Sequence, residues 1–170
     1  MRMFMTGMMF LALCLNAQAG PLEDWMEAEA KAVEAWHKMP LSVRDVAFAS
    51  SEPQGYGLYE PRSSDVFTPN DVIRIYAEAL GYGWDILPNG TRQTTLITDL
   101  AVKDADGDVI MVKKEFARNV VESRRDMLRV YLNYKITLEE FPEGDYSLIV
   151  RLRDSTGKDT QFDKAFKVRQ

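Results

Sequence analysis

The stretch that decides the fold is FPEGDYSLIVRLRDSTGKDTQFDKAFKV, residues 141–168. Its first half alternates apolar with polar residues, and the apolar set is Tyr146, Leu148, Val150 and Leu152. A period of two is typical of a strand with one buried face. The segment therefore predicts two strands, residues 146–153 and 160–168, joined by a short polar turn. The Pro-x-Gly-x-Tyr lead-in is typical of an immunoglobulin-like sandwich near its end.

The rest of the chain after Pro40 also shows the sequence pattern of strands. Five further segments show apolar alternation between turn signals: residues 41–49, 71–80, 94–103, 109–116 and 127–138. Seven strands are the number expected of an immunoglobulin-like sandwich. We therefore expect an all-β fold, a seven-stranded antiparallel sandwich domain over residues 41–170. The connection over residues 50–70 is unusually long, which indicates a functional loop, a mobile loop or a hidden short strand.

Before the sandwich, residues 20–40 are expected to hold one amphipathic α-helix. Apolar side chains recur at helical spacing, and they are Leu22, Trp25, Met26, Ala32, Val33 and Trp36. Glu23 and Asp24 suit the positive end of the helix dipole, and Pro40 ends the helix. The apolar stripe either packs on the sandwich and caps an open end, or docks a partner or a membrane surface.

Residues 1–19 are predicted to be a signal peptide. Arg2 gives a positive start, a short apolar run follows, and Ala17-Gln18-Ala19 is a cleavage site of the A-x-A type. The apolar run is too short to span a bilayer, so no transmembrane segment is expected. Cys14 lacks the small preceding residue that lipid attachment requires. We expect a periplasmic or secreted protein.

The composition limits the classes of partner. The full chain carries 21 Lys and Arg against 26 Asp and Glu, and loss of Arg2 with the signal peptide leaves 20 − 26 = −6. An acidic domain argues against nucleic-acid binding. The one cysteine lies in the signal peptide, so the exported domain has no disulfide and is stable by packing alone.

Catalytic signals are few. His37 is the single histidine, and no nucleophile motif or histidine cluster for zinc is present. We therefore expect no enzyme, no cofactor and no metal. The best metal-like pattern is Asp104, Asp106 and Asp108 with Glu115, which imitates a calcium loop. Val109 stands where such a loop needs glycine, so a polar hairpin turn is the preferred interpretation.

Two candidate surfaces remain. Aromatic residues in glycine-rich connections, with a nearby arginine, could bind a ligand: Tyr56, Tyr59, Arg62, Tyr82 and Trp84. Alternatively, these rings cover the ends of the sandwich. A basic patch could bind an anionic partner: Arg124, Arg125, Arg129, Lys135, Arg151 and Arg153, preceded in the chain by Lys113, Lys114 and Arg118. The alternative is that these charges protect strand edges and pair with nearby acids.

Several motifs together resemble a group of exported bacterial β-sandwich proteins of immunoglobulin or fibronectin III type. They are Gly55-Tyr56-Gly57, Tyr59-Glu60-Pro61-Arg62, Phe67-Thr68-Pro69, Ile75-Tyr76-Ala77-Glu78, Gly81-Tyr82-Gly83-Trp84, Ser123-Arg124-Arg125-Asp126, Tyr134 and the terminal hairpin. The resemblance covers residues 41–168. It implies the sandwich fold and, since the group has no established activity, it transfers no catalytic residue.

The expected function is therefore a non-catalytic interaction module that binds a protein partner. The alternatives are a carbohydrate-binding module that uses the Gly-Tyr-Gly loops and a hydrolase that works through carboxylates.

Overall fold

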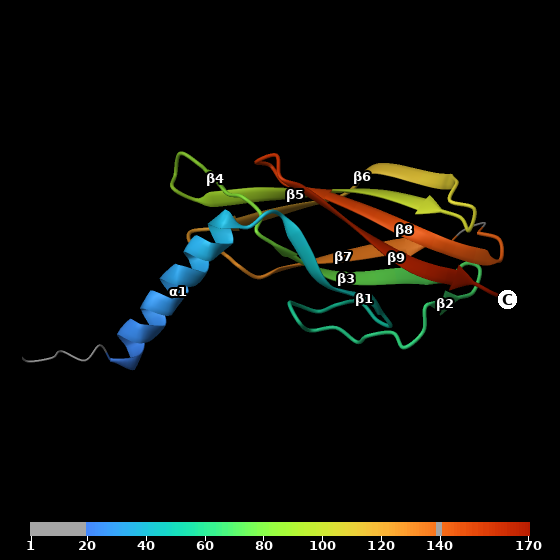
Figure 1. Cartoon of the computed structure of the whole chain (residues 1–170), viewed down its shortest axis with the longest axis horizontal. Coiled ribbons are helices and arrows are strands. Elements are labelled where there is room, and N and C mark those ends of the chain that lie inside the picture. Colours follow the sequence, from blue (N-terminus) through green and yellow to red (C-terminus); the bar gives the residue numbers. More distant parts are fainter. Residues whose placement is uncertain (1–19, 139–140) are drawn as a thin grey trace, which may run out of the picture.

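The computed structural model describes residues 20–138 and 141–170, which form one helix and nine strands (Figure 1). The elements are α1 (Pro21–Lys38), β1 (Ser42–Ala49), β2 (Val66–Phe67), β3 (Val72–Leu80), β4 (Asp85–Ile86), β5 (Arg92–Lys103), β6 (Val109–Ser123), β7 (Val130–Thr137), β8 (Gly144–Arg153) and β9 (Asp159–Val168). The predicted signal peptide and Cys14 lie outside the described residues.

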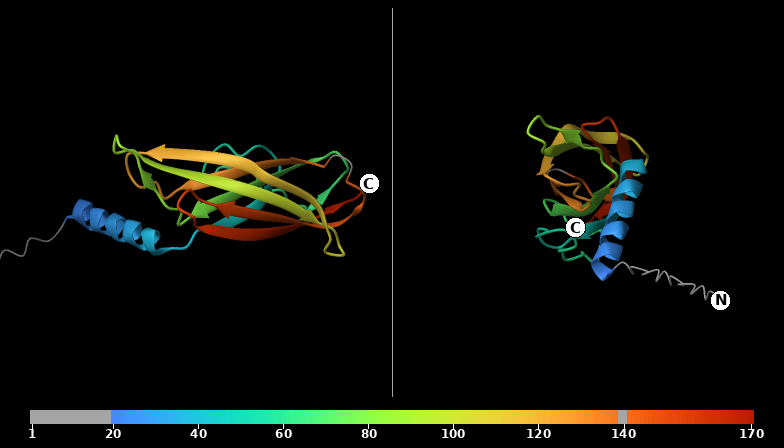
Figure 2. Two further views of the ribbon diagram at one scale, coloured as in Figure 1. Left: turned by 90° about the horizontal axis from the view of Figure 1, so that it is seen from above. Right: turned by 90° about the vertical axis from the view of Figure 1, so that its left-hand side faces the viewer.

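The strands form two sheets that pack face to face (Figures 1 and 2). The smaller sheet has the order β1-β3-β7 and is antiparallel throughout. The larger sheet has the order β2-β9-β8-β5, and β5 also pairs with β4 and with β6. Only the short β2–β9 pair is parallel among the strand pairs described. Because β8 and β6 pair with the same stretch of β5, they lie on its opposite edges, and β6 ends the larger sheet.

The core lies between the sheets and is filled by every second residue of the long strands. Its largest fully buried members include Ile73, Ile75, Leu96, Leu100, Leu132, Tyr134, Leu148 and Phe166. In β3 the opposite face is buried as well, because the segment between β1 and β2 covers Tyr76 and Glu78. A strand that is covered on both sides cannot show a simple period-two pattern of exposure.

The C-terminal hairpin has the form that its sequence predicts. The two predicted strands fall within β8 and β9, which pair in antiparallel register from Gly144 with Val168 to Arg153 with Asp159. At the start of β8 the Tyr146 hydroxyl donates a hydrogen bond to the carbonyl oxygen of Pro142, four residues earlier, at 2.8 Å. This contact fixes the entry of the chain into the hairpin.

Helix α1 projects from one end of the sandwich, at the end opposite the C-terminus (Figure 2). Pro21 opens it, and acidic residues in the first turn with His37 and Lys38 in the last complement its dipole. Of its 18 residues only Trp36 is buried. Of the two predicted roles for the apolar stripe, Trp36 performs the capping one, whereas Leu22, Trp25 and Met26 are exposed. Within the described residues no helix is long and apolar enough to cross a membrane.

The predicted count of seven strands needs correction. All seven predicted strands are present, and the structure adds β2 and β4, which are two residues long and too short to show periodicity. β6 also extends seven residues beyond Phe116, to Ser123. The pairing of β5 and β6 is irregular between Leu100 and Thr98, and Glu115 has a φ of 48° there. This bulge breaks the alternation in the sequence without ending the strand.

Candidate functional site

The aromatic residues of the first Gly-Tyr-Gly loop lie on the outer face of the smaller sheet. The ring of Tyr59 stacks on Tyr76, with centroids 4.0 Å apart. The Tyr56 hydroxyl accepts a hydrogen bond from Arg44 Nη2 at 2.6 Å, and the Arg129 guanidinium lies 5.9 Å from its ring centroid. Both predicted ligand-binding tyrosines are half-buried. The loop therefore folds back on the face of the sheet, whereas the alternative interpretation expected the rings to cover the ends of the sandwich.

A buried polar network holds this loop in place. The Tyr76 hydroxyl donates to Glu78 Oε1 and accepts from the Gly57 N–H, each at 2.7 Å, while Arg44 Nε donates to Glu78 Oε2 at 2.8 Å. Burial and the adjacent Glu78 carboxylate raise the pKa of Tyr76 to about 12. Burial also raises the pKa of Glu78, but hydrogen bonds from Tyr76, Tyr56 and Arg44 outweigh it and leave that pKa below its usual value. Glu78 is thus a structural carboxylate.

The second aromatic pair lies where α1 meets the sandwich. Tyr82 is fully buried, its ring centroid 4.9 Å from that of Trp36 and 5.4 Å from that of Trp84. Its hydroxyl donates to the carbonyl oxygen of Met127, and Trp36 Nε1 donates to the Tyr82 carbonyl oxygen at 3.3 Å. Tyr82 belongs to the core and cannot present its ring to a ligand. Trp84 is half-buried beside it.

Arg62 has a local role as well. Its guanidinium lies 4.4 Å from the ring centroid of Phe67, and it donates to the carbonyl oxygens of Ser64 and Val66. The five predicted ligand-binding residues therefore do not converge. They divide between the outer face of the smaller sheet, the helix end of the sandwich and the loop before β2.

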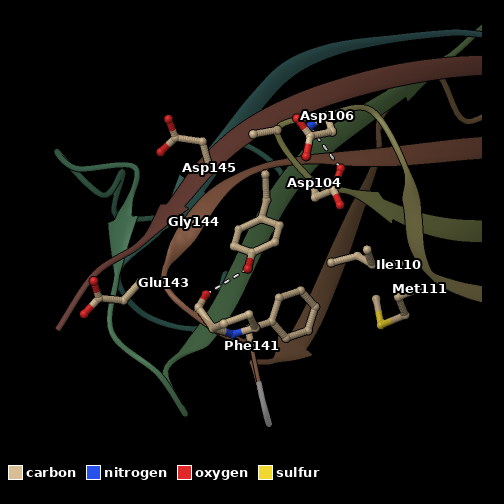
Figure 3. A pocket seen from close by; sticks show the side chains of 11 residues that line it. Asp104, Asp106, Ile110, Met111, Phe141, Glu143, Gly144 and Asp145 are labelled. Atoms are coloured by element: carbon tan, nitrogen blue, oxygen red, sulfur yellow. Dashed lines mark hydrogen bonds between the residues drawn. The ribbon is translucent and has the colours of Figure 1, made fainter.

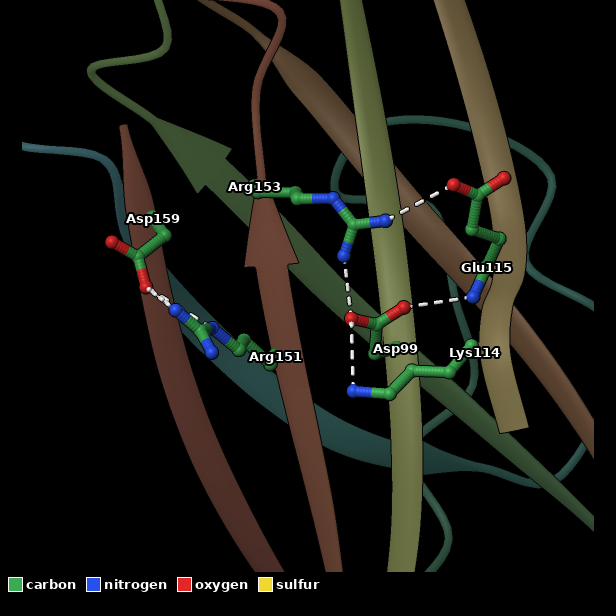
Figure 4. A network of polar contacts seen from close by, with 6 residues as sticks. All are labelled: Asp99, Lys114, Glu115, Arg151, Arg153 and Asp159. Carbon is green, nitrogen blue, oxygen red and sulfur yellow. Dashed lines mark hydrogen bonds and ion pairs between the residues drawn. The ribbon is translucent and has the colours of Figure 1, made fainter. Parts of the chain in front are cut away.

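The predicted basic patch also divides. Arg151 and Arg153 lie on β8, on the outer face of the larger sheet, where carboxylates neutralise them (Figure 4). Arg151 Nη2 pairs with Asp159 Oδ2 at 2.7 Å. Arg153 Nη1 pairs with Asp99 Oδ2 at 2.5 Å, and its Nη2 with Glu115 Oε1 at 3.3 Å. These two arginines hold neighbouring strands together and offer little free charge.

The other four basic residues lie along a different side of the molecule. Arg124 and Arg125 are in the connection between β6 and β7, Arg129 directly precedes β7, and Lys135 is on β7. Because β7 belongs to the smaller sheet and β8 to the larger one, Lys135 cannot continue a patch formed by Arg151. The expectation of one continuous patch is therefore wrong, since it required β7 and β8 to share a sheet.

The side formed by β6 and β7 carries a groove. In the described structure β6 pairs only with β5, and β7 pairs only with β3, so each strand has one unpaired edge. One hollow of about 410 Å³ is lined by Lys113, Phe116, Lys135 and Ile136, among others. A second of about 400 Å³ is lined by residues 118–121 of β6 and by Val130, Tyr131 and Asn133 of β7. The start of β6 thus lies beside the end of β7, and we call these hollows together the β6–β7 groove.

Positive charge collects along the β6–β7 groove. Lys113, Arg118 and Lys135 line its hollows and are exposed, and none has a carboxylate within 4.0 Å among the residues described. Exposed apolar side chains, Val112 and Val120, accompany them on β6. In an acidic chain, this side offers cations that lack an ion pair within the described part of the chain, next to apolar surface.

Two amides in the β6–β7 groove lack partners. Asn119 Nδ2 of β6 and Asn133 Oδ1 of β7 are buried atoms without a hydrogen bond to any described residue. Both residues line the second hollow. A buried polar atom without a partner is costly and is commonly satisfied by a bound group or water. The sequence gives no signal for this pair, because their proximity depends on how the two sheets meet.

A wider cleft lies at the end of the molecule remote from α1 (Figure 3). Its volume is about 580 Å³, and it lies between the β5–β6 turn and the start of β8. The residues that line it include four acids and five apolar or aromatic residues: Asp104, Asp106, Glu143 and Asp145, and Ile110, Met111, Phe141, Pro142 and Tyr146. Met111 and Phe141 line both this cleft and the first hollow of the β6–β7 groove, so the two are continuous.

The predicted calcium-like segment forms the tip of the β5–β6 hairpin. Asp104 Oδ1 accepts hydrogen bonds from the N–H groups of Asp106 and Asp108, at 3.1 and 2.9 Å. This is the side-chain capping of a polar turn. Over residues 20–138 and 141–170 no group of three or more histidine, cysteine or acidic residues is arranged to hold a metal ion. His37 Nε2 lies 3.6 Å from Asp126 Oδ2 at the end of α1.

No protein-family model matches the chain, and no curated protein sequence matches it. Among solved structures, it is similar to the sporulation control protein Spo0M from Bacillus subtilis, with a TM-score of 0.39 and 11% identity over 78% of this chain and 50% of that one. It is also similar to the Pseudomonas fluorescens alkylpurine DNA glycosylase AlkC, bound to DNA containing an abasic site analog, with a TM-score of 0.43 and 10% identity over 88% of this chain and 40% of that one. The chain thus spans half or less of these proteins, and likenesses this distant carry no argument about function.

Proposed function

We propose that this chain is an exported, non-catalytic protein-binding module that binds an extended segment of a partner in the β6–β7 groove. The observation that carries the proposal is that two unpaired strand edges border one groove. Each edge presents a row of backbone N–H and C=O groups without a neighbouring strand. An added strand satisfies these groups, which is a common mode of peptide recognition. The periplasm or the extracellular space is the compartment that the N-terminal sequence favours.

An immunoglobulin-type scaffold is part of the proposal. The order β1-β3-β7 corresponds to strands A, B and E of that fold, and β5, β8 and β9 correspond to C, F and G. The Tyr146 hydrogen bond to Pro142, before β8, matches the tyrosine corner of strand F. The constant-type fold has a fourth strand, D, beside E. Here the edge of β7 has no such strand, and a partner segment would occupy that place.

The charges of the β6–β7 groove favour one kind of partner segment. Lys113, Arg118 and Lys135 would attract acidic side chains, and Val120 and Tyr131 would contact apolar ones. Opposite charges on adjacent strands stabilise their pairing, and like charges oppose it. A second copy of β6 is disfavoured, because antiparallel self-pairing about the middle of the strand places Lys114 near Arg118 of the other copy. The partner segment is therefore one that alternates apolar with acidic residues.

Sugar binding is less well supported than protein binding. Tyr82 is fully buried, and Tyr59 already stacks on Tyr76. These contacts use the ring faces that a carbohydrate would need. The free backbone edges and free cations of the β6–β7 groove suit a polypeptide better.

The test uses an acetylated peptide of the length of β7 that alternates valine and glutamate, with a fluorophore at its C-terminus. We expect fluorescence anisotropy to show saturable binding to the purified chain, and much weaker binding of a valine–lysine peptide. Exchanging Arg118→Glu together with Lys135→Glu should weaken binding about tenfold or more, since two favourable charge contacts become repulsive. The matched control is Lys31→Glu on α1, which changes charge far from the groove and should leave affinity unchanged.

Backbone pairing is tested separately by N-methylation of the peptide. Methylating one set of alternate amides should abolish binding, and methylating the other set should not, because a strand added to the edge of β7 turns only one set of its amides toward that edge. Equal binding of both methylated peptides would mean that charge alone holds the ligand, and it would refute strand addition. Absence of binding to any of the peptides would refute the proposed function.

A further inference from the structure

The cleft in Figure 3 continues the β6–β7 groove, and it differs from the groove in charge. Of residues 20–138 and 141–170, four carboxylates and no cation line the cleft, whereas Lys113 and Lys135 line the adjoining hollow. Met111 and Phe141 line both and so connect them. A ligand that lies along the whole path therefore meets a negative potential at one end and a positive potential along its length. We call the cleft the acidic mouth of the groove.

The acidic mouth is only partly neutralised from within. Asp145 pairs with Arg169, and Glu143 Oε1 accepts a hydrogen bond from the Gln170 N–H at 3.1 Å. The side chain of Asp106 makes no hydrogen bond or ion pair with the described residues and is exposed. The apolar side chains in the lining exclude water from part of the cleft, which strengthens the attraction of a cation that enters. The mouth is therefore complementary to a positive group attached to an apolar one.

The topology gives the end of the partner segment that reaches this mouth. β7 runs from Val130 to Thr137, and Phe141, which lines the acidic mouth, is four positions further along the chain. The smaller sheet is antiparallel throughout. A strand that joins the edge of β7 in the same antiparallel manner begins where β7 ends. Its N-terminus therefore lies at the mouth.

We infer that the partner segment is bound by its amino-terminal end, with a free α-ammonium group or an N-terminal lysine or arginine held in the acidic mouth. This inference rests on the proposed function and adds the orientation and the terminal chemistry of the ligand. The acidic and apolar residues that follow would lie along the basic part of the groove. Directional charge of this kind selects one orientation of a strand and excludes the reverse.

The experiment compares five peptides that share the valine–glutamate core. One is acetylated, one has a free N-terminus, one is acetylated with lysine at the N-terminal end, one is acetylated with glutamine there, and one carries lysine at the C-terminal end. We expect the free amine and the N-terminal lysine each to tighten binding about three- to tenfold over the acetylated core, an amount typical of one partly screened charge contact. Terminal glutamine and C-terminal lysine should give no gain.

Paired variants assign the gain to the acidic mouth. Asp106→Asn with Glu143→Gln should remove the gain from N-terminal positive charge and leave affinity for the acetylated core unchanged. The matched control is Glu52→Gln with Asp65→Asn, which removes the same charge from exposed sites elsewhere and should preserve the gain. If the core peptide binds but a positive N-terminus gives no gain, or the mouth variants keep that gain, the inference is refuted and the proposed function stands. If the core peptide does not bind, both are refuted.

Discussion

At the scale of single residues, Tyr146 has the clearest structural role. Its hydroxyl bonds the Pro142 carbonyl oxygen at 2.8 Å, and its ring stacks with Phe166 at a centroid distance of 5.3 Å. Tyr146→Phe keeps the ring and removes only the hydrogen bond. We expect it to lower the free energy of unfolding by about 0.5–1.5 kcal/mol, measured by urea denaturation. Tyr59→Phe is the control, because the Tyr59 hydroxyl has no hydrogen bond to a described residue, and an equal loss there would contradict this role.

Asp99 gives a second prediction at this scale. Burial raises its pKa, but the Glu115 N–H at 2.7 Å and the charges of Arg153 and Lys114 outweigh this and leave the pKa below its usual value. A carboxylate with a depressed folded-state pKa contributes stability above its unfolded pKa of about 3.9, and this stability is lost as pH falls through the folded value.

Asp99→Asn should therefore lower stability at neutral pH and flatten the loss of stability below about pH 4, as followed by urea denaturation at several pH values. Asp65→Asn, which changes an exposed acid in the connection before β2, serves as the comparison. An unchanged pH profile for Asp99→Asn would exclude the ion-pair network as a source of acid sensitivity.

At the scale of elements, the two tryptophans in the apolar stripe of α1 differ in their exposure to solvent. Trp36 is 5% exposed and packs on Tyr82, whereas Trp25 is 59% exposed. Trp36→Ala should lower the free energy of unfolding by about 3–5 kcal/mol, since it leaves a cavity in the core. Trp25→Ala should change it by less than about 0.5 kcal/mol. Thermal and urea denaturation of the two variants measure the difference, and equal effects would show that α1 packs on the sandwich along its length.

The sequence predicted the elements with regular periodicity and missed features that depend on distant contacts. The hairpin of β8 and β9 was predicted from the alternation of Leu148, Val150 and Leu152 with polar residues, because each strand has one face toward the solvent. Burial of Glu78 could not be predicted, since it depends on a loop that covers the outer face of β3. The unpaired edge of β6 could not be predicted either, because the periodicity of a sequence does not give the order of strands in a sheet. Of the groove, the sequence analysis named only cations: Lys135 in the predicted basic patch, and Lys113 and Arg118 before it in the chain.

At the scale of the whole molecule, the arrangement of charge predicts how a partner arrives. The chain has a formal net charge of −5, yet Lys113, Arg118 and Lys135 line one groove without a described carboxylate partner. A positive groove focuses the electric field and accelerates the association of an acidic segment, and salt screens this effect over a Debye length of about 10 Å at 0.1 M.

Raising the salt from about 0.05 M to 0.5 M should therefore slow association of the valine–glutamate peptide about tenfold or more. The dissociation rate should change less, because backbone pairing is local and poorly screened. Stopped-flow fluorescence measures both rates. Lys31→Glu should keep the salt dependence of the association rate, whereas Arg118→Glu with Lys135→Glu should reduce that dependence. An association rate independent of salt in the unmodified chain would show that the charge of the groove does not accelerate binding.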